Sequence, residues 1–391
     1  MPVEAVAPQL APYVEAFERT PHTEAQRAAF EQFLAQGMPS QHDENWKFTN
    51  LAPLVKTAFE PAEPGDAARA QKILAGFPDD ENRIVFLNGR RFNAPPQQHA
   101  AEKSRASGPF VSLNAAFSSD AAVVHVRGAM AEPVHVIHIF LPGAHPQMTH
   151  PRNVFVFESG AQGSIIETYV GEGTYFHNAV TEIVVGEGAI VEHVKLQRES
   201  LDAFHISVIH VEQARGSVFT SRSFALGGAL ARTEIYALLD EGSECTLHGL
   251  YVVNGTQHAD TRTVIDHAKP HAASHEVYKG ILDGKSSAVF NGKIIVRKDA
   301  QKTDAKQTNK NLVLSEDATI NTKPQLEIFA DDVKCTHGAT VGQLDAESMF
   351  YLRSRGIDAG QARAMLIDAF AHEVIDGIKE QKFREYVGQL V

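Results

Sequence analysis

A short motif recurs at near-regular intervals through the middle of the chain, and it restricts the possible folds more than any other feature. Each copy has a glycine, a small residue, a variable residue, an apolar residue and then Glu or Thr. The copies begin at Gly163, Gly188, Gly216 and Gly242, in steps of 25, 28 and 26 residues. A period in the twenties that is built from strands and turns is typical of a solenoid whose coils stack on one another.

The sequence around these repeats, from about Val123 to Val341, consists of short runs rich in Val, Ile, Thr and Phe that are separated by Gly, Asn and Asp. Such runs predict strands joined by tight turns. We therefore expect a mainly β protein whose core is a right-handed parallel β-helix with three short strands per coil. Roughly eight coils at a spacing of ~4.8 Å would make a rod on the order of 40 Å long.

The repeat also predicts which side chains point into the core. The apolar positions of the four copies are Ile166, Val191, Phe219 and Cys245. Cys245 is therefore expected to be a buried core thiol. The next similar start is Gly284, which lies 42 residues after Gly242. This gap predicts an insertion or a deformed coil around residues 269–275.

Helical segments are expected on both sides of the core. Residues 8–36 fit two helices separated near Pro21, followed by a Pro- and Gly-rich linker after Leu51. Residues 84–87 should form a strand that ends in a tight turn at Asn88-Gly89.

Capping residues predict a helical hairpin at the end of the sequence. Asp345 can cap a short helix, Gly356 can end it, and Asp358 can cap a longer helix. The apolar stripe of the longer helix would contain Leu366, Phe370, Val374 and Ile378. We expect three domains: a helical one with a linker and short strands (1–120), the β-helix (121–343) and a C-terminal helical domain (344–391).

Charge and hydropathy narrow the range of partners. The chain has 36 Lys and Arg against 48 Asp and Glu, a formal charge of -12, which disfavours nucleic acid as a partner. No apolar run approaches the ~18 residues that would cross a bilayer. The first ten residues also lack the basic start and apolar stretch of a signal peptide. We therefore expect a cytoplasmic protein that does not associate with a membrane.

Potential metal ligands are present, but they do not form a complete site in the sequence. The two cysteines, Cys245 and Cys335, are ninety positions apart, so neither a disulfide framework nor a self-contained zinc site is expected. Nineteen histidines could suggest a metal or cupin site. Their spacings disagree, however, and pairs such as His205 and His210 would face opposite ways on a strand. We expect such histidines to be exposed or to have hydrogen-bond partners.

Cys335 and His337 form a different kind of pair, because they lie two residues apart and would point the same way on a strand. Val333, Ala339 and Val341 share that face. One interpretation is an apolar face that happens to contain a thiol and an imidazole. The alternative is half of a tetrahedral site for iron or zinc, which a second chain would complete.

Three runs at the C-terminal end and one near the N-terminus resemble SufD proteins of the SufB/SufD family of iron–sulfur cluster assembly scaffolds. The runs are Cys335–Asp345, Met349–Ile357, Ala362–Phe370 and Trp46–Thr49, the last with Phe48 where the family is expected to have Tyr. The similarity extends over nearly the whole chain. It implies a helical N-terminal domain, a β-helix core and a helical C-terminal domain, in agreement with the patterns above.

The resemblance further implies a complex with a SufB-like scaffold subunit and a SufC-like ATPase, in which this chain is not itself an enzyme. Cys335 and His337 match residues at the interface of the two scaffold subunits, where a transient iron–sulfur cluster is expected to form. No cofactor is expected to bind tightly to the isolated chain, for which a homodimer is an open alternative. The C-terminal helices are expected to dock the ATPase, with Arg353, Arg355 and Phe370 as candidate contacts.

Two other function classes remain as alternatives. A carbohydrate-active β-helix enzyme would need a cluster of carboxylates along one exposed face, whereas Asp and Glu are scattered in this sequence. A free-standing metal-binding β protein would need a complete set of ligands within one chain.

Overall fold

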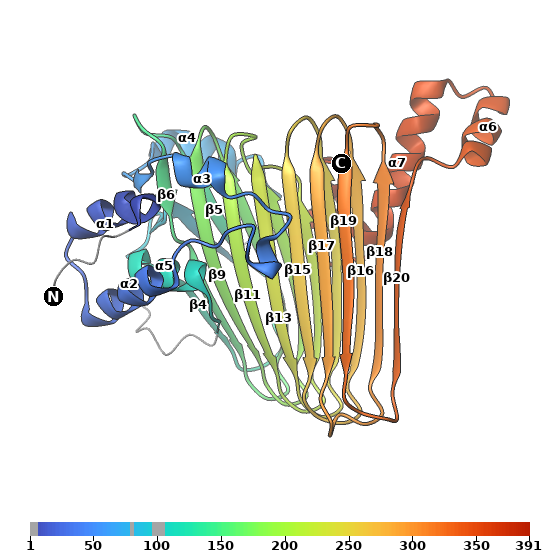
Figure 1. Ribbon diagram of the computed structural model, residues 1–391, viewed down its shortest axis with the longest axis horizontal. Coiled ribbons are helices and arrows are strands. Elements are labelled where there is room, and N and C mark those ends of the chain that lie inside the picture. The colour runs from blue at the N-terminus through green and yellow to red at the C-terminus, as the bar shows by residue number, and fades with distance from the viewer. Residues whose placement is uncertain (1–6, 79–81, 96–105) are drawn as a thin grey trace.

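The computed structural model describes residues 7–78, 82–95 and 106–391, which form a parallel β-solenoid flanked by helices (Figure 1). The expected mainly β core with helical segments on both sides is confirmed. Residues 1–6, which begin the stretch without signal-peptide features, lie outside the described residues. No helix in the described ranges is long and apolar enough to span a bilayer.

Two ten-stranded sheets form the walls of the solenoid. Sheet A contains β1 (Glu60–Pro61), β4 (Ala122–Val126), β6 (Gln147–Thr149), β7 (Arg152–Phe157), β9 (Tyr175–Val185), β11 (Phe204–Gln213), β13 (Leu230–Leu239), β15 (His258–His267), β17 (Ser287–Val296) and β19 (Thr319–Ile328). Sheet B contains β2 (Arg83–Leu87), β3 (Arg90–Arg91), β5 (Val134–Phe140), β8 (Gln162–Gly171), β10 (Ile190–Arg198), β12 (Val218–Ala225), β14 (Glu244–Val253), β16 (Ala273–Leu282), β18 (Asp304–Val313) and β20 (Lys334–Gly342). From β8 onward, consecutive strands alternate between the sheets. Each of these coils therefore has two long strands, and the expected three short strands per coil are wrong.

Each coil turns at a residue in the left-handed backbone region, and these residues form a column along one edge of the solenoid. They are Gly160, Gly188, Gly216, Gly242, His271 and Lys302. The backbone N–H of each of the first five donates to the carbonyl of the residue that precedes the next one, as from Gly188 to Arg215 at 3.0 Å. The first repeat therefore starts at Gly160, three residues before the predicted Gly163.

Regular coils continue beyond Gly242, so the expected insertion or deformed coil at residues 269–275 is wrong. His271 has φ 63° and its N–H donates to the Gln301 carbonyl at 2.9 Å, as a glycine would in this turn. Gly284 belongs to the turns at the opposite edge, beside Gly255. The next coil therefore has no glycine at its turn that would mark it in the sequence.

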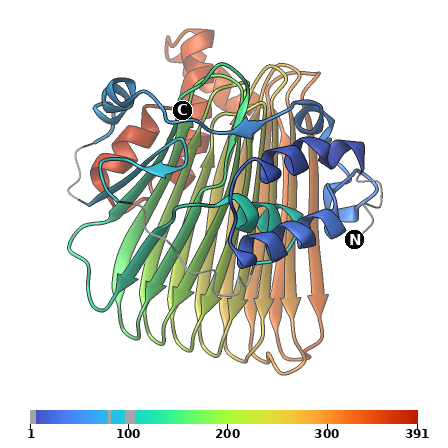
Figure 2. The same cartoon turned by 90° about the vertical axis from the view of Figure 1, so that its left-hand side faces the viewer.

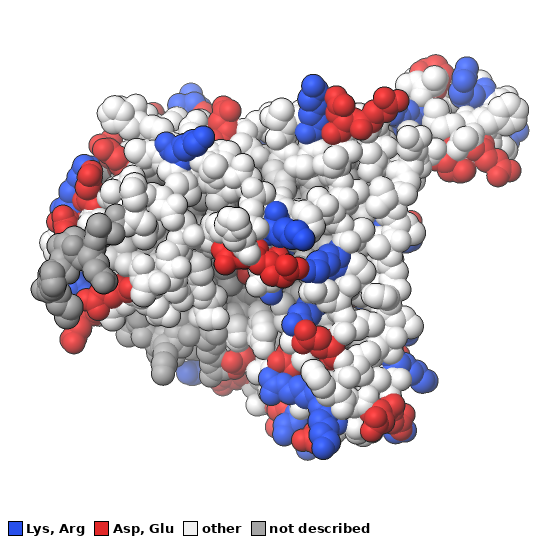
Figure 3. Space-filling view, viewed as in Figure 1, with Lys and Arg blue, Asp and Glu red and all other residues white. Residues whose placement is uncertain are grey.

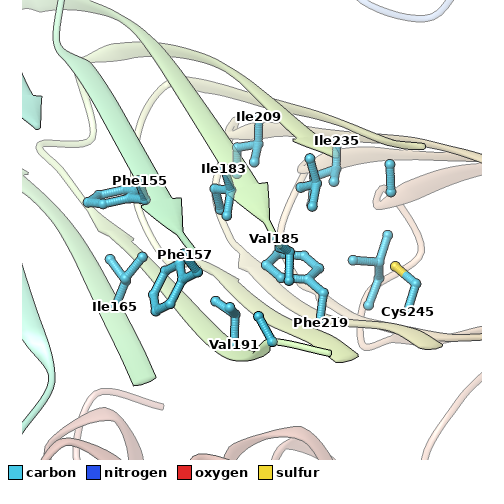
Figure 4. Packing of buried hydrophobic residues seen from close by; sticks show 14 of the residues in the cluster. Phe155, Phe157, Ile165, Ile183, Val185, Val191, Ile209, Phe219, Ile235 and Cys245 are labelled. Carbon is cyan, nitrogen blue, oxygen red and sulfur yellow. The ribbon is translucent and has the colours of Figure 1, made fainter. Parts of the chain in front are cut away.

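The inward-facing residues of the two sheets fill the solenoid. Val191, Phe219 and Cys245 are paired in register and point into this core, as expected (Figure 4). Ile166 does not: its Cα pairs with Val194, and it packs on the outer face of sheet B. The reason is the three-residue error at the first repeat, because an odd shift along a strand moves a side chain to the other face.

The N-terminal helices cover the outer face of sheet A, as Figure 2 shows from that end of the molecule. They are η1 (Pro8–Leu10), α1 (Ala11–Glu18), α2 (Glu24–Gln36), η2 (Glu44–Trp46), α3 (Ala52–Lys56) and α5 (Pro109–Phe117). Helix α4 (Ala67–Leu74) instead packs on β2, β5 and β8 of sheet B. The two expected helices on either side of Pro21 are confirmed. The expected linker after Leu51 instead contains α3, β1 and α4. Proline is tolerated in the first turn of α3, and Asp66 caps α4.

The strand at residues 84–87 and its turn are confirmed. β2 and β3 form an antiparallel hairpin whose turn residues, Asn88 and Gly89, have φ values of 48° and 76°. Such positive values suit a two-residue hairpin turn. Through β2 this hairpin joins the end of sheet B.

The motif at residues 46–49 anchors the N-terminal segment to sheet A. The Arg232 guanidinium lies over the Trp46 ring at 3.7 Å and also pairs with Asp260 and, at 2.7 Å, with Glu234. Thr49 donates to Asp260 as well. This part of the resemblance therefore has a structural explanation, because the motif fixes an N-terminal segment on strands β13 and β15.

Three helices, instead of the expected hairpin, follow the last strand. They are α6 (Ala346–Ser354), α7 (Ala359–Ile375) and α8 (Gln381–Gly388). Asp345 and Asp358 cap α6 and α7, and Gly356 has φ 89° between them, as expected. Ile378 lies beyond α7 but is buried with the α7–α8 cluster. Helices α7 and α8 cover outward apolar residues of sheet B, whereas α6 projects beyond β20 (Figure 1). The predicted domain limits at residues 120 and 343 remain a prediction.

Candidate functional site

Cys335 and His337 lie on β20, the last strand of sheet B, where the solenoid stops. β20 pairs only with β18, and β19 ends sheet A in the same way. Both strands therefore have one hydrogen-bonding edge without a neighbouring strand in the described part of the chain. We call this the open end. Its exposed apolar residues include Phe329, which is 64% accessible to solvent, and Val341, which is 54% accessible.

The two candidate ligands have different surroundings, although they share the inward-facing side of β20. Cys335 is half-buried and packs against the cluster that contains Ala305 and Ile294. Burial raises the pKa of its thiol. His337 is exposed because no further coil covers it. A partner at the open end would thus contact His337 directly, whereas it would reach only the exposed part of Cys335.

The strand register places the two cysteines in one inward column of sheet B. Cys335 pairs with Ala305, Ala305 with Ser274, and Ser274 with Cys245. Three strand spacings put their backbones roughly 14 Å apart, too far for a disulfide. Cys245 is buried and burial raises its pKa, so the prediction of a core thiol is confirmed.

A second inward column ends at His337, and sequence reasoning missed it. On β14, β16, β18 and β20 this column contains Leu247, Glu276, Gln307 and His337. Glu276 and Gln307 are fully buried and hydrogen-bonded to each other. The column could have been found only by assigning His271 and Lys302 to the glycine positions of the turns, since this sets the register of β16 and β18.

A buried group of metal-ligand side chains lies elsewhere, inside the earlier coils. His177, Glu199 and His205 have ligand atoms within 4.8 Å of one another. Glu199 faces both imidazoles, at 2.5 Å from His177 and 2.8 Å from His205, and Gln197 also donates to it. Lys195 contacts the other nitrogen of His205 at 2.9 Å.

The buried carboxylate and ammonium of this group have partners among the described residues. Burial would raise the pKa of Glu199, but the imidazoles of His205 and His177 outweigh it and hold that pKa well below its usual range. Burial lowers the pKa of Lys195 to about 8. The carboxylates of Glu167 and Glu199 oppose this shift and stabilise the ammonium. This agrees with the expectation that such histidines have hydrogen-bond partners.

The candidate contacts for the ATPase fall on two separate surfaces. Arg353 and Arg355 are exposed at the end of α6, where Arg355 lies 5.7 Å from the Tyr351 ring. Phe370 instead faces sheet B. Its carbonyl accepts from Lys279 at 2.8 Å, and its ring lies 4.1 Å from the same ammonium.

Three exposed apolar residues lie near these arginines, and sequence reasoning missed them. Phe350 is 74% exposed, Tyr351 58% and Met365 49%. Phe350 and Tyr351 belong to α6, which projects from the solenoid, and Met365 lies in the first half of α7. We call them the α6 patch. An apolar surface on a projecting element is typical of a protein-binding site.

Neither sign of charge dominates the face of the molecule shown in Figure 3. Acidic and basic side chains occur together along sheet A and at the lower turns. Lys293 pairs with Glu327 at 2.7 Å, and Arg262 lies 3.5 Å from Glu234. Among the described residues, this face therefore has no continuous basic stripe of the kind that binds nucleic acid.

Comparison with known proteins agrees with this architecture. Residues 140–370 match the family model described as SUF system FeS cluster assembly, SufBD core domain. An iron–sulfur cluster assembly SufBD family protein of Synechocystis is 36% identical over 382 residues, which cover 87% of this chain and 84% of that protein. The iron–sulfur cluster assembly protein SufD of Escherichia coli is 34% identical over 383 residues, which cover 91% of this chain and 89% of that protein. The chain therefore belongs to the SufBD family of the iron–sulfur cluster assembly system SUF.

Proposed function

We propose that this chain is a non-catalytic, SufD-like scaffold subunit that forms a cytoplasmic complex with a SufB-like subunit and a SufC-like ATPase. In this proposal the open end contacts the SufB-like subunit, and residues 344–391 dock the ATPase. An iron–sulfur cluster forms transiently between the two scaffold subunits and is then passed on. The open end, with His337 exposed on its last strand, is the observation that supports the proposal most directly.

The two ends of the solenoid differ in a way that favours a partner at the open end. At the N-terminal end the last strands are short: β1 and β3 have two residues each, and β4 has five. At the open end, β19 and β20 have ten and nine residues. Proteins normally shorten or cover such edges, because long unpaired edges associate with other chains. A SufB-like solenoid with a matching edge would supply the missing neighbour.

The ligands available at the open end suit a cluster that is built and then released. Cys335 and His337 supply one thiol and one imidazole, so a second chain must supply the remaining ligands. Burial raises the pKa of the Cys335 thiol, and a protonated thiol binds metal weakly. The cluster is thus cargo of the complex and not a resident cofactor of this chain.

The C-terminal helices are suited to transmit force from an ATPase. The α6 patch and Arg353 and Arg355 project into solvent, while α7 is attached to sheet B by Lys279. Dimerisation of the ATPase on ATP would pull on these helices in both scaffold subunits and open their interface. Such coupling requires the ATPase to bind the open and closed arrangements with different affinities.

Copurification with the SufB-like and SufC-like proteins tests both surfaces in one experiment. Val341→Glu places a charge at the open end and should remove the SufB-like subunit, whereas Phe350→Ser should remove the ATPase. Leu201→Glu is a matched control, because Leu201 is an exposed apolar residue in an early turn, 64% accessible. Retention of both partners by Val341→Glu and Phe350→Ser would show that the two surfaces are wrongly assigned.

A further inference from the structure

The inward column that ends at His337 contains a buried polar pair immediately behind it. Gln307 on β18 is the Cα partner of His337 on β20, and Glu276 on β16 is the Cα partner of Gln307. Glu276 and Gln307 are each 1% exposed. The column thus connects the solenoid interior to the candidate ligand that is exposed at the open end.

The hydrogen bond within the pair fixes the direction of the Gln307 amide. Its Nε2 donates to Glu276 Oε2 at 2.6 Å. The other groups near the carboxyl are Thr263 from β15, Cys245 from β14 and Tyr278 from its own strand. Because the amide nitrogen is held by the carboxyl, the amide oxygen is left to face another partner.

That amide oxygen is a buried acceptor for which the described residues supply no hydrogen bond. Gln307 Oε1 has no partner, although it is inaccessible to solvent. A buried acceptor without a donor is costly, and native proteins rarely leave one. Side chains at paired positions of neighbouring parallel strands lie about 4.8 Å apart, so the His337 ring is within reach of this oxygen.

We propose that Gln307, oriented by Glu276, is the positioning residue for His337 and accepts a hydrogen bond from one nitrogen of its ring. A neutral imidazole has one protonated nitrogen, so this bond would leave the other nitrogen unprotonated and directed away from the solenoid. That nitrogen is the atom that can bind a metal. The metal-binding part of the inference rests on the function proposed above, whereas the hydrogen bond does not.

The proposed role is that of an outer-shell partner. In histidines that bind metals, the N–H of the second ring nitrogen generally donates a hydrogen bond to a carbonyl or carboxylate. This bond fixes the tautomer and the ring orientation. His337 is otherwise free to rotate on an exposed strand. Holding it from behind would reduce the conformational freedom that is lost when the partner subunit and the cluster bind.

Nitrogen NMR of the full-length chain, labelled with ¹⁵N-histidine, tests the proposal without partners or a cluster. At about pH 8.5 a free imidazole is neutral, and its ring nitrogen shifts report the tautomer. The His337 signals can be assigned by their loss in His337→Ala. In the wild-type chain the ratio of the two tautomers should differ from that of free histidine by roughly fivefold, the size expected for one ordinary hydrogen bond.

Three variants separate positioning from a general effect on the fold. Gln307→Met removes the acceptor and should return His337 to the tautomer ratio of free histidine. The exchanged pair Glu276→Gln with Gln307→Glu keeps a hydrogen-bonded amide and carboxyl and places an acceptor beside His337, so the preference should return. Lys306→Met, on the outward face of β18, is the control and should change nothing.

A free-histidine ratio in the wild-type chain would overturn the proposal, as would an unchanged ratio in Gln307→Met. Failure of the exchanged pair to restore the preference, in a chain that melts like the wild type, would also overturn it. Failure of the proposed function would appear elsewhere, as unchanged iron and sulfide in a complex with His337→Ala. The two inferences can therefore be rejected independently.

Discussion

Glu276 is a carboxyl group whose ionisation is disfavoured by its place in the solenoid interior. Burial raises its pKa from 4.5 to about 7, partly offset by Thr263 and Gln307. A raised pKa means that the folded state binds this proton more tightly than the unfolded state does. Below pH 4.5 the carboxyl is protonated in both states and does not oppose folding. The free energy of unfolding then falls as the pH rises from 4.5 through 7.

Glu276→Gln should remove this pH dependence, because the amide keeps the shape of the side chain and does not ionise. The variant should gain stability relative to the wild type between pH 4.5 and 7, up to a limit on the order of 3 kcal/mol. Denaturant unfolding of both chains at pH 4.5 and pH 8 measures the difference, and groups that titrate in both chains cancel. A difference that does not change with pH would contradict this account of the interior.

His271 shows a different kind of residue-scale cost, since it occupies a left-handed turn position that glycine fills in the preceding coils. A left-handed backbone costs a non-glycine residue about 1–2 kcal/mol. Glycine avoids this cost, but it loses more conformational entropy on folding, which offsets part of the gain. His271→Gly should therefore stabilise the chain by roughly 0.5–1 kcal/mol.

Lys298→Gly is the matched control, because Lys298 is an exposed turn residue outside the set of described residues with positive φ. Glycine there should destabilise the chain by a similar amount. Both variants can be compared by their denaturation midpoints. If His271→Gly lowers the midpoint as Lys298→Gly does, then the left-handed position carries no strain.

At the scale of elements, α7 is attached to sheet B by apolar packing and by one buried lysine. The Lys279 side chain is inaccessible, and its ammonium lies 2.5 Å from Glu373 Oε2. Burial lowers the pKa of Lys279, but the bond to Glu373 opposes this shift. Lys310, the partner of Lys279 on β18, lies 3.7 Å from the same carboxylate. Glu373 thus connects the helix to two adjacent strands.

Lys279→Met should loosen α7 without unfolding the solenoid. Methionine retains the packing but loses the bonds to Glu373 and to the Phe370 carbonyl, a change of about 1–2 kcal/mol. Hydrogen exchange of the α7 amides should become roughly tenfold faster, since about 1.4 kcal/mol corresponds to a factor of ten. Lys306→Met should leave this exchange unchanged. Equal exchange in the two variants would show that apolar packing alone holds the helix.

The sequence predicted the elements better than it predicted their register. Glycine and small residues at a regular spacing were enough to indicate stacked parallel coils, because turns between parallel strands require left-handed residues. The position of Ile166 was wrong because the first repeat begins at Gly160, and a three-residue shift reverses the faces of a strand. The coils after Gly242 were expected, but their regular spacing was not predicted, because His271 and Lys302 occupy the turn positions that glycine fills in the earlier coils.

The candidate site was predictable only in part, for a related reason. Cys335 and His337 could be identified because they share a strand face, which depends on local spacing alone. Their neighbours Gln307 and Ala305 are about thirty residues away in sequence and become neighbours through the register of whole coils. The α6 patch was not predicted because exposure of an apolar residue depends on where the helix projects.

At the scale of the whole molecule, each face of the solenoid has a different covering. The N-terminal helices other than α4 cover the outer face of sheet A, and α4, α7 and α8 cover part of the outer face of sheet B. The long edges of β19 and β20 have no cover in the described chain. Two candidate ligands lie at that uncovered end. The molecule is thus organised around one surface that a matching partner could complete.

The central claim, that His337 serves cluster assembly and not the fold, is tested most directly by His337→Ala in the complex with the SufB-like and SufC-like proteins. His337 is exposed, so its removal should leave the thermal midpoint and the copurified partners nearly unchanged. Cys335→Ala should have a weaker effect, because its half-buried thiol packs on the core.

The deciding measurement is the iron and sulfide content of the purified complex, determined together with its melting curve. The account predicts that His337→Ala lowers iron and sulfide severalfold at an unchanged melting temperature. Full iron and sulfide content in this variant, or a melting temperature several degrees lower with loss of the partners, would contradict it.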